Sequence, residues 1–400
     1  MIVGFVINLL SILIGYLIGS ISPAYIFGKL KHIDIRIQGS GNAGTTNVYH
    51  TLGASYAIPT AIIDTLKGVF SIFIAQIIGA NFICAQLSGL ATVIGHVFPL
   101  YLGFRGGRGV ACATGILLFY LLQYIFISID ILYVMLFLGI LIIIFAYISK
   151  NGKIIRIIIL PLLGYSASLL YSHNAYSYFF YIVIGYITLA AIFGIITDKV
   201  IKVRDKNFKT HWWRVALRPF AFIFIFFYLI YSKLLTLTII GIIFICFFGL
   251  DIFRFLSKQT NKLLTIKVKS LFRKSESKKL SSMTLFLLAA FITIILFDKN
   301  IAILALTFLI FGDIFSKIFG LAFGRNKLFN KTFEGTLAYI GSVLICGFLF
   351  YLTLHFSLLI LIIGGITAPL TELVSFRLND NFTVPLVSGA LMTLGIFLLA

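Results

Sequence analysis

Long apolar stretches alternate with short polar segments along the whole chain. Each stretch is close to the roughly 20 residues that a helix needs to cross a bilayer core of about 30 Å. The first half contains such stretches at 2–20, 55–80, 82–103, 110–128, 131–149, 157–172 and 176–197. The second half continues with 219–232, 234–252, 283–297, 301–318, 335–352, 357–373 and 384–400. The pattern predicts an all-α polytopic membrane protein with about 14 transmembrane helices in two seven-span halves.

The composition excludes a soluble globular protein. The chain is 60% hydrophobic and 11% charged, whereas soluble domains carry roughly 25% charged residues. Its mean hydropathy is +1.10. The formal net charge of +20 comes from 32 basic and 12 acidic residues, so the placement of the charges is informative.

Basic residues cluster in alternate loops of the first half, at 29–36, 105–108, 150–156 and 199–218. The positive-inside rule places such loops in the cytoplasm. It predicts a multi-pass protein of the cell membrane with an external N-terminus and cytoplasmic sites. The segment 199–218 is polar and basic, so it is interpreted as a linker between residues 1–198 and 219–400. The two halves share no visible repeat, and we interpret them as two different domains and not as a duplication.

The stretch GSGNAGTTN, Gly39–Asn47, has the G-x-G-x-x-G spacing of dinucleotide-binding loops, with Asp64 twenty residues after the last glycine. That fold needs a buried strand before the loop. Residues 31–38 are too polar for one, and Asp64 lies inside an apolar run. We therefore interpret the loop as an anion-binding nest that precedes a helix N-terminus.

Two further elements lie on the same predicted face of the membrane. A second glycine and arginine loop, GFRGGRGV (Gly103–Val110), precedes the next span, and Asp64 and Lys67 are three residues apart within a span. Charges inside a membrane usually mark function, although a structural Asp–Lys pair remains an alternative. Together these elements predict a site for a phosphate-carrying substrate, with catalysis by positioning and charge stabilisation.

The motifs GSISPAYIFGKL, DIR, GSGNAGTTNVYHTLG, DTLKG and GHVFPLYLGFRGGRGVA follow one another over residues 1–200. They resemble the membrane acyl-phosphate:glycerol-3-phosphate acyltransferase family, the PlsY type. The resemblance implies acyl transfer from acyl phosphate to the 1-hydroxyl of sn-glycerol 3-phosphate, giving lysophosphatidate for phospholipid synthesis without a cofactor. It implies catalytic roles for Ser20, Arg36, Lys67 and His96. The implied substrate contacts are Gly39, Ser40, Gly41, Asn42, Gly44, Thr45, Thr46, Asn47, Asp64, Arg105, Gly106, Gly107 and Arg108.

The chain departs from this family near the end of the first half. The family carries a His-x-x-Asn pair close to its last span, and the segment Thr197–Asn207 offers no such pair. His50 stands where the family usually has Arg after the glycine loop. If the missing pair is needed for catalysis, this half is slow, altered in its donor, or inactive.

Four of the twelve acids of the chain lie at or beside predicted cytoplasmic span ends in the second half: Asp313, Glu334, Glu372 and Asp380. Any one of them is consistent with a solvated acid at a helix end. As a group, mixed with Lys317, Arg325 and Lys331, they favour a site for Mg²⁺ and nucleotide phosphates, because Mg²⁺ typically bridges carboxylates to substrate phosphates.

The ordered set GD-(x)6-G-(x)3-G, K-T-x-E-G, T-E and D-N-(x)3-P resembles the CTP-dependent polyprenol, dolichol, phytol and diacylglycerol kinase family over residues 211–400. The resemblance implies phosphorylation of a lipid alcohol with CTP and Mg²⁺. It implies catalytic roles for Asp313 and Glu334, and metal ligands Asp313, Glu372 and Asp380. The implied nucleotide contacts are Lys317, Arg325, Lys331 and Asn381. Phosphatidate cytidylyltransferase is the alternative relative, but its His-Gly-Gly and Asp-Arg runs are missing here.

The two resemblances predict a bifunctional enzyme in which a glycerol-3-phosphate acyltransferase domain is fused to a membrane lipid kinase-like domain. Its expected partners are acyl phosphate, glycerol 3-phosphate, a lipid alcohol, CTP and the bilayer, with no nucleic acid. A transporter or scaffold that binds phosphorylated lipids through the same loops is the non-enzymatic alternative. It predicts binding without turnover and without dependence on CTP or a metal.

Overall fold

The computed structural model describes residues 2–128, 130–171, 175–198, 221–257, 261, 279–329, 331–374 and 379–399. The interpreted linker at 199–218 lies outside the described residues. The chain divides into two compact units, Met1–Ile140 with Gly152–Val200, and Leu141–Asn151 with Ile201–Ala400. Helix α7 (Asp130–Ser149) therefore contributes its first part to unit 1 and its second part to unit 2.

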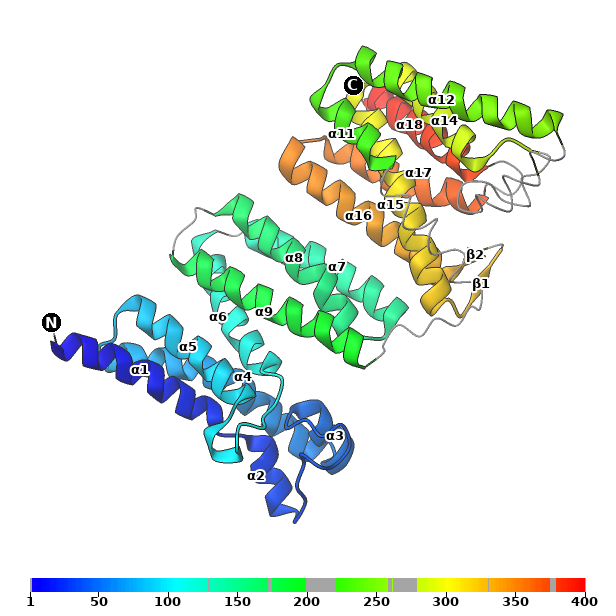
Figure 1. Cartoon of the computed structure of the whole chain (residues 1–400). Helices are drawn as coiled ribbons and strands as arrows, with labels where there is room; N and C mark the ends of the chain where they lie inside the picture. The colour runs from blue at the N-terminus through cyan, green and yellow to red at the C-terminus, as the bar shows by residue number, and fades with distance from the viewer. Residues whose placement is uncertain are drawn as a thin grey trace. The chain divides into compact units, whose positions relative to one another are not determined.

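Every apolar stretch predicted in the first half forms a helix in unit 1 or in α7 (Figure 1). The helices of unit 1 besides α7 are α1 (Ile2–Ser20), α2 (Pro23–Leu30), α3 (Thr45–Leu52), α4 (Ala54–Ile77), α5 (Phe82–Val97), η1 (Leu100–Leu102), α6 (Val110–Ile127), α8 (Gly152–Leu170) and α9 (Ala175–Thr197). The short helices α2 and α3, which flank the first glycine loop, were not predicted. They are too short to carry a spanning pattern.

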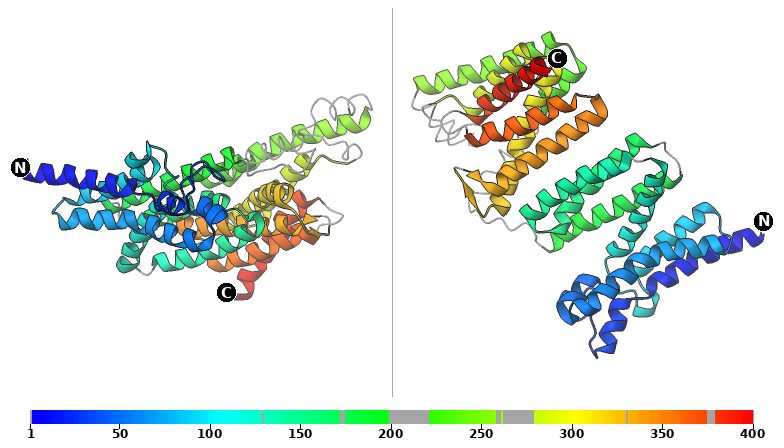
Figure 2. Two further views of the ribbon diagram at one scale, coloured as in Figure 1. Left: turned by 90° about the horizontal axis from the view of Figure 1, so that it is seen from below. Right: turned by 180° about the vertical axis from the view of Figure 1, so that it is seen from behind.

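Small and hydroxylated residues bring α1 and α5 together along their length (Figure 2). A Cβ atom on Gly15 or Gly19 would overlap the backbone of α5, so only glycine permits this approach. Ser88 donates to Ser11 O at 2.8 Å, and Thr92 donates to Gly15 O at 2.9 Å. Small residues and hydroxyl groups are typical of helix contacts in membranes. This contact fixes the ends of α1 and α5, where the first site lies.

The predicted stretches of the second half also form helices. Unit 2 contains α11 (Phe222–Ile230), α12 (Lys233–Leu256), α14 (Ser282–Leu296), α15 (Lys299–Phe323), α16 (Phe333–Leu354), α17 (Leu358–Val374) and α18 (Asp380–Leu399), with the antiparallel strands β1 (Lys327–Leu328) and β2 (Lys331–Thr332). Helix α15 is its most enclosed long helix among the described residues, 78% buried over its apolar window. It packs against α11, α14, α16, α17 and α18.

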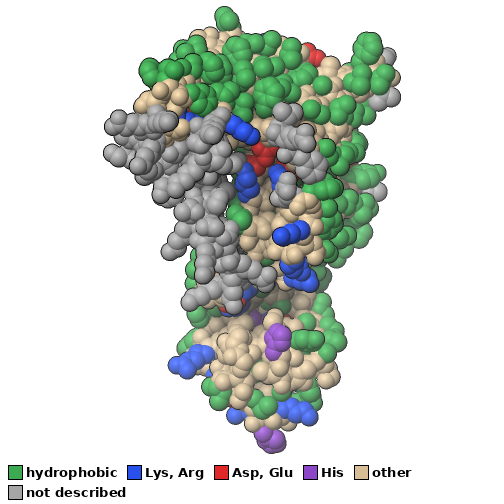
Figure 3. Space-filling model, turned by 90° about the vertical axis from the view of Figure 1, so that its right-hand side faces the viewer, with side chains coloured by type: hydrophobic (Ala, Val, Ile, Leu, Met, Phe, Trp, Pro, Cys, Tyr) green, Lys and Arg blue, Asp and Glu red, His purple; other side chains and the backbone are tan. Residues whose placement is uncertain are grey.

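Eleven helices of the described chain are long and apolar enough to cross a membrane. Helices α14 and α17 are apolar but shorter, and α11 has nine residues. Hydrophobic side chains cover much of the surface (Figure 3), as expected for helices that face lipid. The prediction of a helical membrane protein is confirmed, with the small β1–β2 ladder as an addition, and the count of 14 spans stays a prediction.

Candidate functional sites

The first glycine loop is built around the side chain of Asn47. Its Oδ1 accepts from the backbone N–H of Ser40 at 2.9 Å, and its Nδ2 donates to Ile35 O at 2.9 Å and Gln38 O at 3.0 Å. Gly39 has a φ of +59°, and a Cβ there would overlap Asn47 Oδ1. Asn47, predicted as a substrate contact, is therefore used within the loop, which it holds in shape.

The loop ends at the open N-terminus of α3. Gly44 precedes the first turn and supplies no side-chain cap, so the first N–H groups of the helix are available to an anion. The Oγ1 atom of Thr45 is buried and has no hydrogen-bond partner. An apolar pocket begins here, and its lining residues are Thr45, Thr46, Tyr49, Ala57, Ile58 and Ala61.

Arg36 ties the first glycine loop to the segment before the second. Its Nε and Nη2 donate to the two carboxylate oxygens of Asp34 at 3.0 and 2.8 Å, and its Nη1 donates to Leu102 O at 3.0 Å. The guanidinium also lies 4.8 Å from the ring centre of Tyr25. Hydrogen bonds from Arg36 lower the pKa of Asp34 to about 2. Asp34 was not predicted as a partner of Arg36.

Asp64, Lys67 and His96 form one buried cluster. Lys67 Nζ lies 2.9 Å from Asp64 Oδ1 and 2.8 Å from His96 Nδ1. His96 Nδ1 lies 3.3 Å from the same carboxylate oxygen. The ammonium group also donates to Gly19 O and Ile21 O, both at 3.1 Å. The helical i, i+3 contact lies where the sequence places it, and His96 joins it from α5.

Both glycine loops meet at His96. The backbone N–H of Gly107 donates to His96 O at 3.1 Å. A Cβ atom on Gly107 would overlap His96 Nε2 and would lie 2.8 Å from Ala43 O in the first loop. Nδ1 of His96 therefore contacts the charged cluster, and Nε2 lies beside Gly107, where the second loop approaches Ala43 of the first.

The side chains of three other predicted residues of this half are not part of the charged cluster. The Ser20 hydroxyl is buried, donates to Tyr16 O at 2.9 Å and accepts from Leu100 N at 3.2 Å, so it fixes the end of α1. Arg105 is exposed. Arg108 pairs with Asp198 at 3.1 Å.

Asp198 directly follows α9 and was missed by the sequence analysis. It accepts from Arg108 and from Lys153, and hydrogen bonds from both lower its pKa. It lies in the segment where the family pattern called for a His-x-x-Asn pair. An acid among basic loop residues was the available signal, because an isolated carboxylate beside cations pairs with them.

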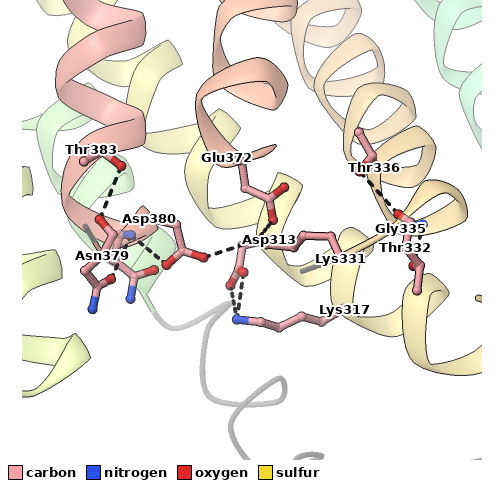
Figure 4. A network of polar contacts seen from close by, with 11 residues as sticks. Asp313, Lys317, Lys331, Thr332, Gly335, Thr336, Glu372, Asn379, Asp380 and Thr383 are labelled. Carbon is pink, nitrogen blue, oxygen red and sulfur yellow. Dashed lines mark hydrogen bonds and ion pairs between the residues drawn. The ribbon is translucent and has the colours of Figure 1, made fainter. Parts of the chain in front are cut away.

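In unit 2, three of the four predicted acids converge. Asp313 comes from α15, Glu372 from α17 and Asp380 from α18, and one oxygen of each lies within 4.8 Å of the others (Figure 4). The side chains of Asp313 and Glu372 are 4% and 1% exposed, and that of Asp380 is 29% exposed. Helix α15 continues to Phe323, so Asp313 lies well inside the helix and not at its predicted end.

Two lysines accompany these carboxylates. Lys317 Nζ lies 2.7 and 3.0 Å from the oxygens of Asp313. Lys331 contacts Glu372 Oε1 and lies 3.4 Å from Asp380 Oδ2. The other carboxylate oxygen of Glu372 is buried without a hydrogen-bond partner. Clustered carboxylate oxygens are the ligands that Mg²⁺ prefers, so the residues present fit a divalent cation.

Glu334, the fourth acid, is not part of this cluster. Its Oε2 accepts from the backbone N–H groups of Arg325 and Asn326 at 3.0 and 3.2 Å. Arg325 in turn donates to Tyr147 O at 2.8 Å. Glu334 and Arg325 therefore join the residues before β1 to the start of α16, and the predicted catalytic role of Glu334 stays a prediction.

Asn381 also has a local role. Its backbone N–H donates to Asn379 Oδ1 and Asp380 Oδ1, both at 3.0 Å, and its side chain lies 3.4 Å from Ser282 O. These contacts orient the start of α18, which carries Asp380. The predicted nucleotide contact of Asn381 stays a prediction.

A buried ion pair in α12 was not predicted. Arg254 Nη1 lies 3.2 Å from Asp251 Oδ1, and neither side chain is exposed. Asp251 Oδ2 accepts from Ser281 N and Thr284 Oγ1, both at 2.7 Å. The pair therefore joins α12 to the start of α14. The signal was an Asp and an Arg three residues apart inside an apolar run.

Comparison with known proteins supports a relationship for the first half. The glycerol-3-phosphate acyltransferase family model matches residues 9–205. A glycerol-3-phosphate acyltransferase of Alkaliphilus metalliredigens is 50% identical over 114 residues, which are 28% of this chain and 57% of that protein. One of Geobacter metallireducens is 47% identical over 103 residues, which are 26% of this chain and 53% of that protein. The chain thus spans about half the length of the curated relatives it matches.

One solved structure was also compared with the chain. The crystal structure of an integral membrane glycerol 3-phosphate acyltransferase, PlsY, in its glycerol 3-phosphate form is 29% identical to this chain. The match covers 48% of this chain and 92% of that protein, with a TM-score of 0.38. The family match ends at residue 205, so the interpretation of unit 2 rests on its own residues.

Proposed function

We propose that residues 1–200 form a membrane glycerol-3-phosphate acyltransferase that takes its acyl group from acyl phosphate. The observation that carries the proposal is the convergence of both glycine loops on His96 and Gly107, beside the buried Asp64–Lys67 pair. The family match over residues 9–205 supports it. The basic loops of this chain, read with the positive-inside rule, support placement of this site at the cytoplasmic face of the cell membrane.

The reaction needs a bound phosphate and a stabilised leaving group. In our proposal the phosphate of glycerol 3-phosphate binds at the first loop and the N-terminus of α3, near Arg36, because these groups favour anions. The 1-hydroxyl oxygen bonds to the acyl carbonyl carbon, the bond from that carbon to the phosphate oxygen breaks, and inorganic phosphate leaves. The hydroxyl proton passes to the departing phosphate. No cofactor takes part in this balance.

The charged cluster positions these groups. Lys67 holds the carbonyl groups of Gly19 and Ile21 and so fixes the break between α1 and α2. Its positive charge, held against Asp64 and His96, lies close to the second loop. Fixed charges and N–H groups in a water-poor site stabilise the transition state without reorganisation.

The test is turnover by the purified full-length protein. Supplied with palmitoyl phosphate and radiolabelled glycerol 3-phosphate, it should yield lysophosphatidate. Arg36→Ala and Lys67→Ala should each lower the rate by about 100-fold or more. Lys31→Ala, which removes an exposed cation of the same region that lies over Tyr56, is the matched control and should retain activity. Binding of glycerol 3-phosphate without product would favour the non-enzymatic alternative.

For unit 2 we propose CTP-dependent phosphorylation of a lipid alcohol that requires Mg²⁺. The convergence of Asp313, Glu372 and Asp380, with two lysines beside them, favours this second function. When bound, Mg²⁺ would neutralise charge on the nucleotide phosphates. In this proposal Lys317 and Lys331 bind phosphate oxygens of the nucleotide. The alcohol oxygen bonds to the terminal phosphorus of CTP, CDP leaves, and the hydroxyl proton passes to solvent.

Radiolabelled CTP separates this function from cytidyl transfer. With a panel of diacylglycerol and polyprenols, label on the terminal phosphate should enter the lipid and label on the first phosphate should not. The reverse result, with pyrophosphate released, would identify a cytidylyltransferase. Asp313→Asn should abolish transfer in either case, and Lys299→Ala, at the start of α15 away from the carboxylates, should not.

A further inference from the structure

Lys331 fills the position between two of the three carboxylates that are proposed to bind the divalent cation. Its ammonium contacts Glu372 and lies 3.4 Å from Asp380. Figure 4 shows the side chain extending from the β-strand side so that its amine lies between these acids. A metal ion and this ammonium group would compete for the same oxygens.

The charge balance of the cluster favours exchange over simultaneous occupation. Among the described residues, three carboxylates face two ammonium groups, those of Lys317 and Lys331. A divalent cation added to these five groups would leave an excess of positive charge beside the two buried carboxylates, those of Asp313 and Glu372. A divalent cation that replaces Lys331 leaves the three carboxylates balanced by the cation and Lys317. Uncompensated charge in a buried site is costly. Replacement of the Lys331 ammonium by the divalent cation is therefore favoured over binding of both.

The local fold allows the side chain, and not the backbone, to make this exchange. Lys331 pairs with Leu328 in the two-stranded ladder. The next residue, Thr332, caps α16 by accepting from Gly335 N at 3.1 Å. The side chain is 28% exposed, and lysine carries its charge on a flexible four-carbon stem. The ladder pairing and the cap at Thr332 thus hold the backbone of Lys331, while its amine can reach a neighbouring position.

We propose that Lys331 alternates between two positions: between Glu372 and Asp380 when no divalent cation is bound, and on a nucleotide phosphate when the cation replaces it. The proposal rests on the proposed function of unit 2. It makes Lys331 a competitor of the metal and a ligand of the nucleotide, so its removal has opposite effects on the two affinities. A permanent structural ion pair predicts no such opposition, because its loss would weaken both.

The experiment measures both affinities on the full-length protein in detergent. Free Mn²⁺ is followed by electron paramagnetic resonance, and CTP binding at saturating Mn²⁺ by ultrafiltration. Lys331→Met should bind Mn²⁺ about tenfold more tightly than the wild type, which corresponds to about 1.4 kcal/mol, and should bind CTP about tenfold more weakly. Lys327→Met, an exposed lysine on β1, is the matched control and should resemble the wild type in both.

Every other outcome contradicts one part of the proposal. Unchanged or weaker Mn²⁺ binding in Lys331→Met overturns competition at the carboxylates. Tighter Mn²⁺ binding with unchanged CTP binding would show that Lys331 does not bind a nucleotide phosphate. If Asp313→Asn, the wild type and Lys331→Met all fail to bind Mn²⁺, the cation site of the proposed function is wrong, which is distinct from failure of the exchange alone.

Discussion

The ammonium group of Lys67 lies 2.8 Å from Nδ1 of His96, although the two residues belong to different helices. Lys67 extends from α4 and His96 from the last turn of α5. Because both also contact Asp64 Oδ1, the cluster is held by two helices and cannot be reduced to a local helical pair. Whether the cluster has a structural or a catalytic role can be tested by measuring the stability and the activity of the same variants.

Replacing Lys67 alone should lower the stability of the folded protein. Lys67→Met leaves the buried Asp64 without its main counter-charge, which costs about 3–5 kcal/mol. The double variant Asp64→Leu, Lys67→Met removes both charges and should recover most of the stability but none of the acyltransferase activity. Thermal unfolding in detergent and the acyl transfer assay measure the two properties. An active double variant would show that the pair has only a structural role.

A methyl group at Gly107 should disable the first site. The added Cβ would overlap His96 Nε2 and crowd Ala43 O, so it would displace the second loop or the imidazole. A displacement of about 1 Å at reacting groups lowers rates by about 100-fold, and we expect that loss for Gly107→Ala. Gly185→Ala, in α9 with open space around the new Cβ, is the control. Equal activities for the two variants would contradict the proposed convergence.

The Asp34–Arg36 pair sets a pH limit. The folded-state pKa of Asp34 is lowered to about 2, below the ordinary value of about 3.9 for an unfolded chain. The pair therefore stabilises the fold fully above the ordinary value and loses this effect as the pH falls toward 2. The difference in unfolding temperature between the wild type and Asp34→Asn should be constant from about pH 5 to pH 8 and should shrink below about pH 4. A difference that grows on acidification would contradict this assignment.

The orientation predicted from the basic loops can be measured directly. A cysteine at position 31, in the first basic loop, should be protected from a membrane-impermeant maleimide in intact cells and should react after the membrane is opened. A cysteine at position 81, in the loop before α5 without Lys or Arg, should react in intact cells. The background for both is a variant in which Cys84, Cys112, Cys246 and Cys346 are serine. The reverse labelling pattern would invert the topology.

The helices could be predicted from the sequence because their signal is local. A run of apolar residues long enough to cross a membrane has few alternatives to a helix, since each backbone group must be satisfied within the segment. The same reasoning placed Asp64 and Lys67 on one face of α4, because residues three apart are neighbours on a helix. The strands β1 and β2 have two residues each, which is too short for an alternating pattern.

The composition of each site depends on packing between helices, and the sequence pattern does not encode this directly. Asp313, Glu372 and Asp380 meet because α15, α17 and α18 pack together. Glu334 was also predicted near a cytoplasmic span end, but its carboxylate accepts from the backbone N–H of Arg325. The sequence indicated how deep in the membrane each acid lies, but it did not indicate the direction in which each helix turns its side chains. Asp198 and Asp251 were missed although their sequence signals were present, an acid among basic loop residues and an Asp–Arg spacing of three residues.

Removal of divalent cations should separate the two proposed activities of one protein. Acyl transfer from acyl phosphate uses fixed cations of the chain and should be unchanged after treatment with EDTA. Lipid phosphorylation from CTP should disappear and return when Mg²⁺ is restored. Without Mg²⁺, nothing in the proposed site bridges the carboxylates of Asp313, Glu372 and Asp380 to the nucleotide phosphates, and their like charges repel. Both products can be measured in one preparation by thin-layer chromatography. Asp313→Asn should reproduce the effect of EDTA on phosphorylation without affecting acyl transfer, and loss of both activities in that variant would indicate general misfolding and contradict the division of labour.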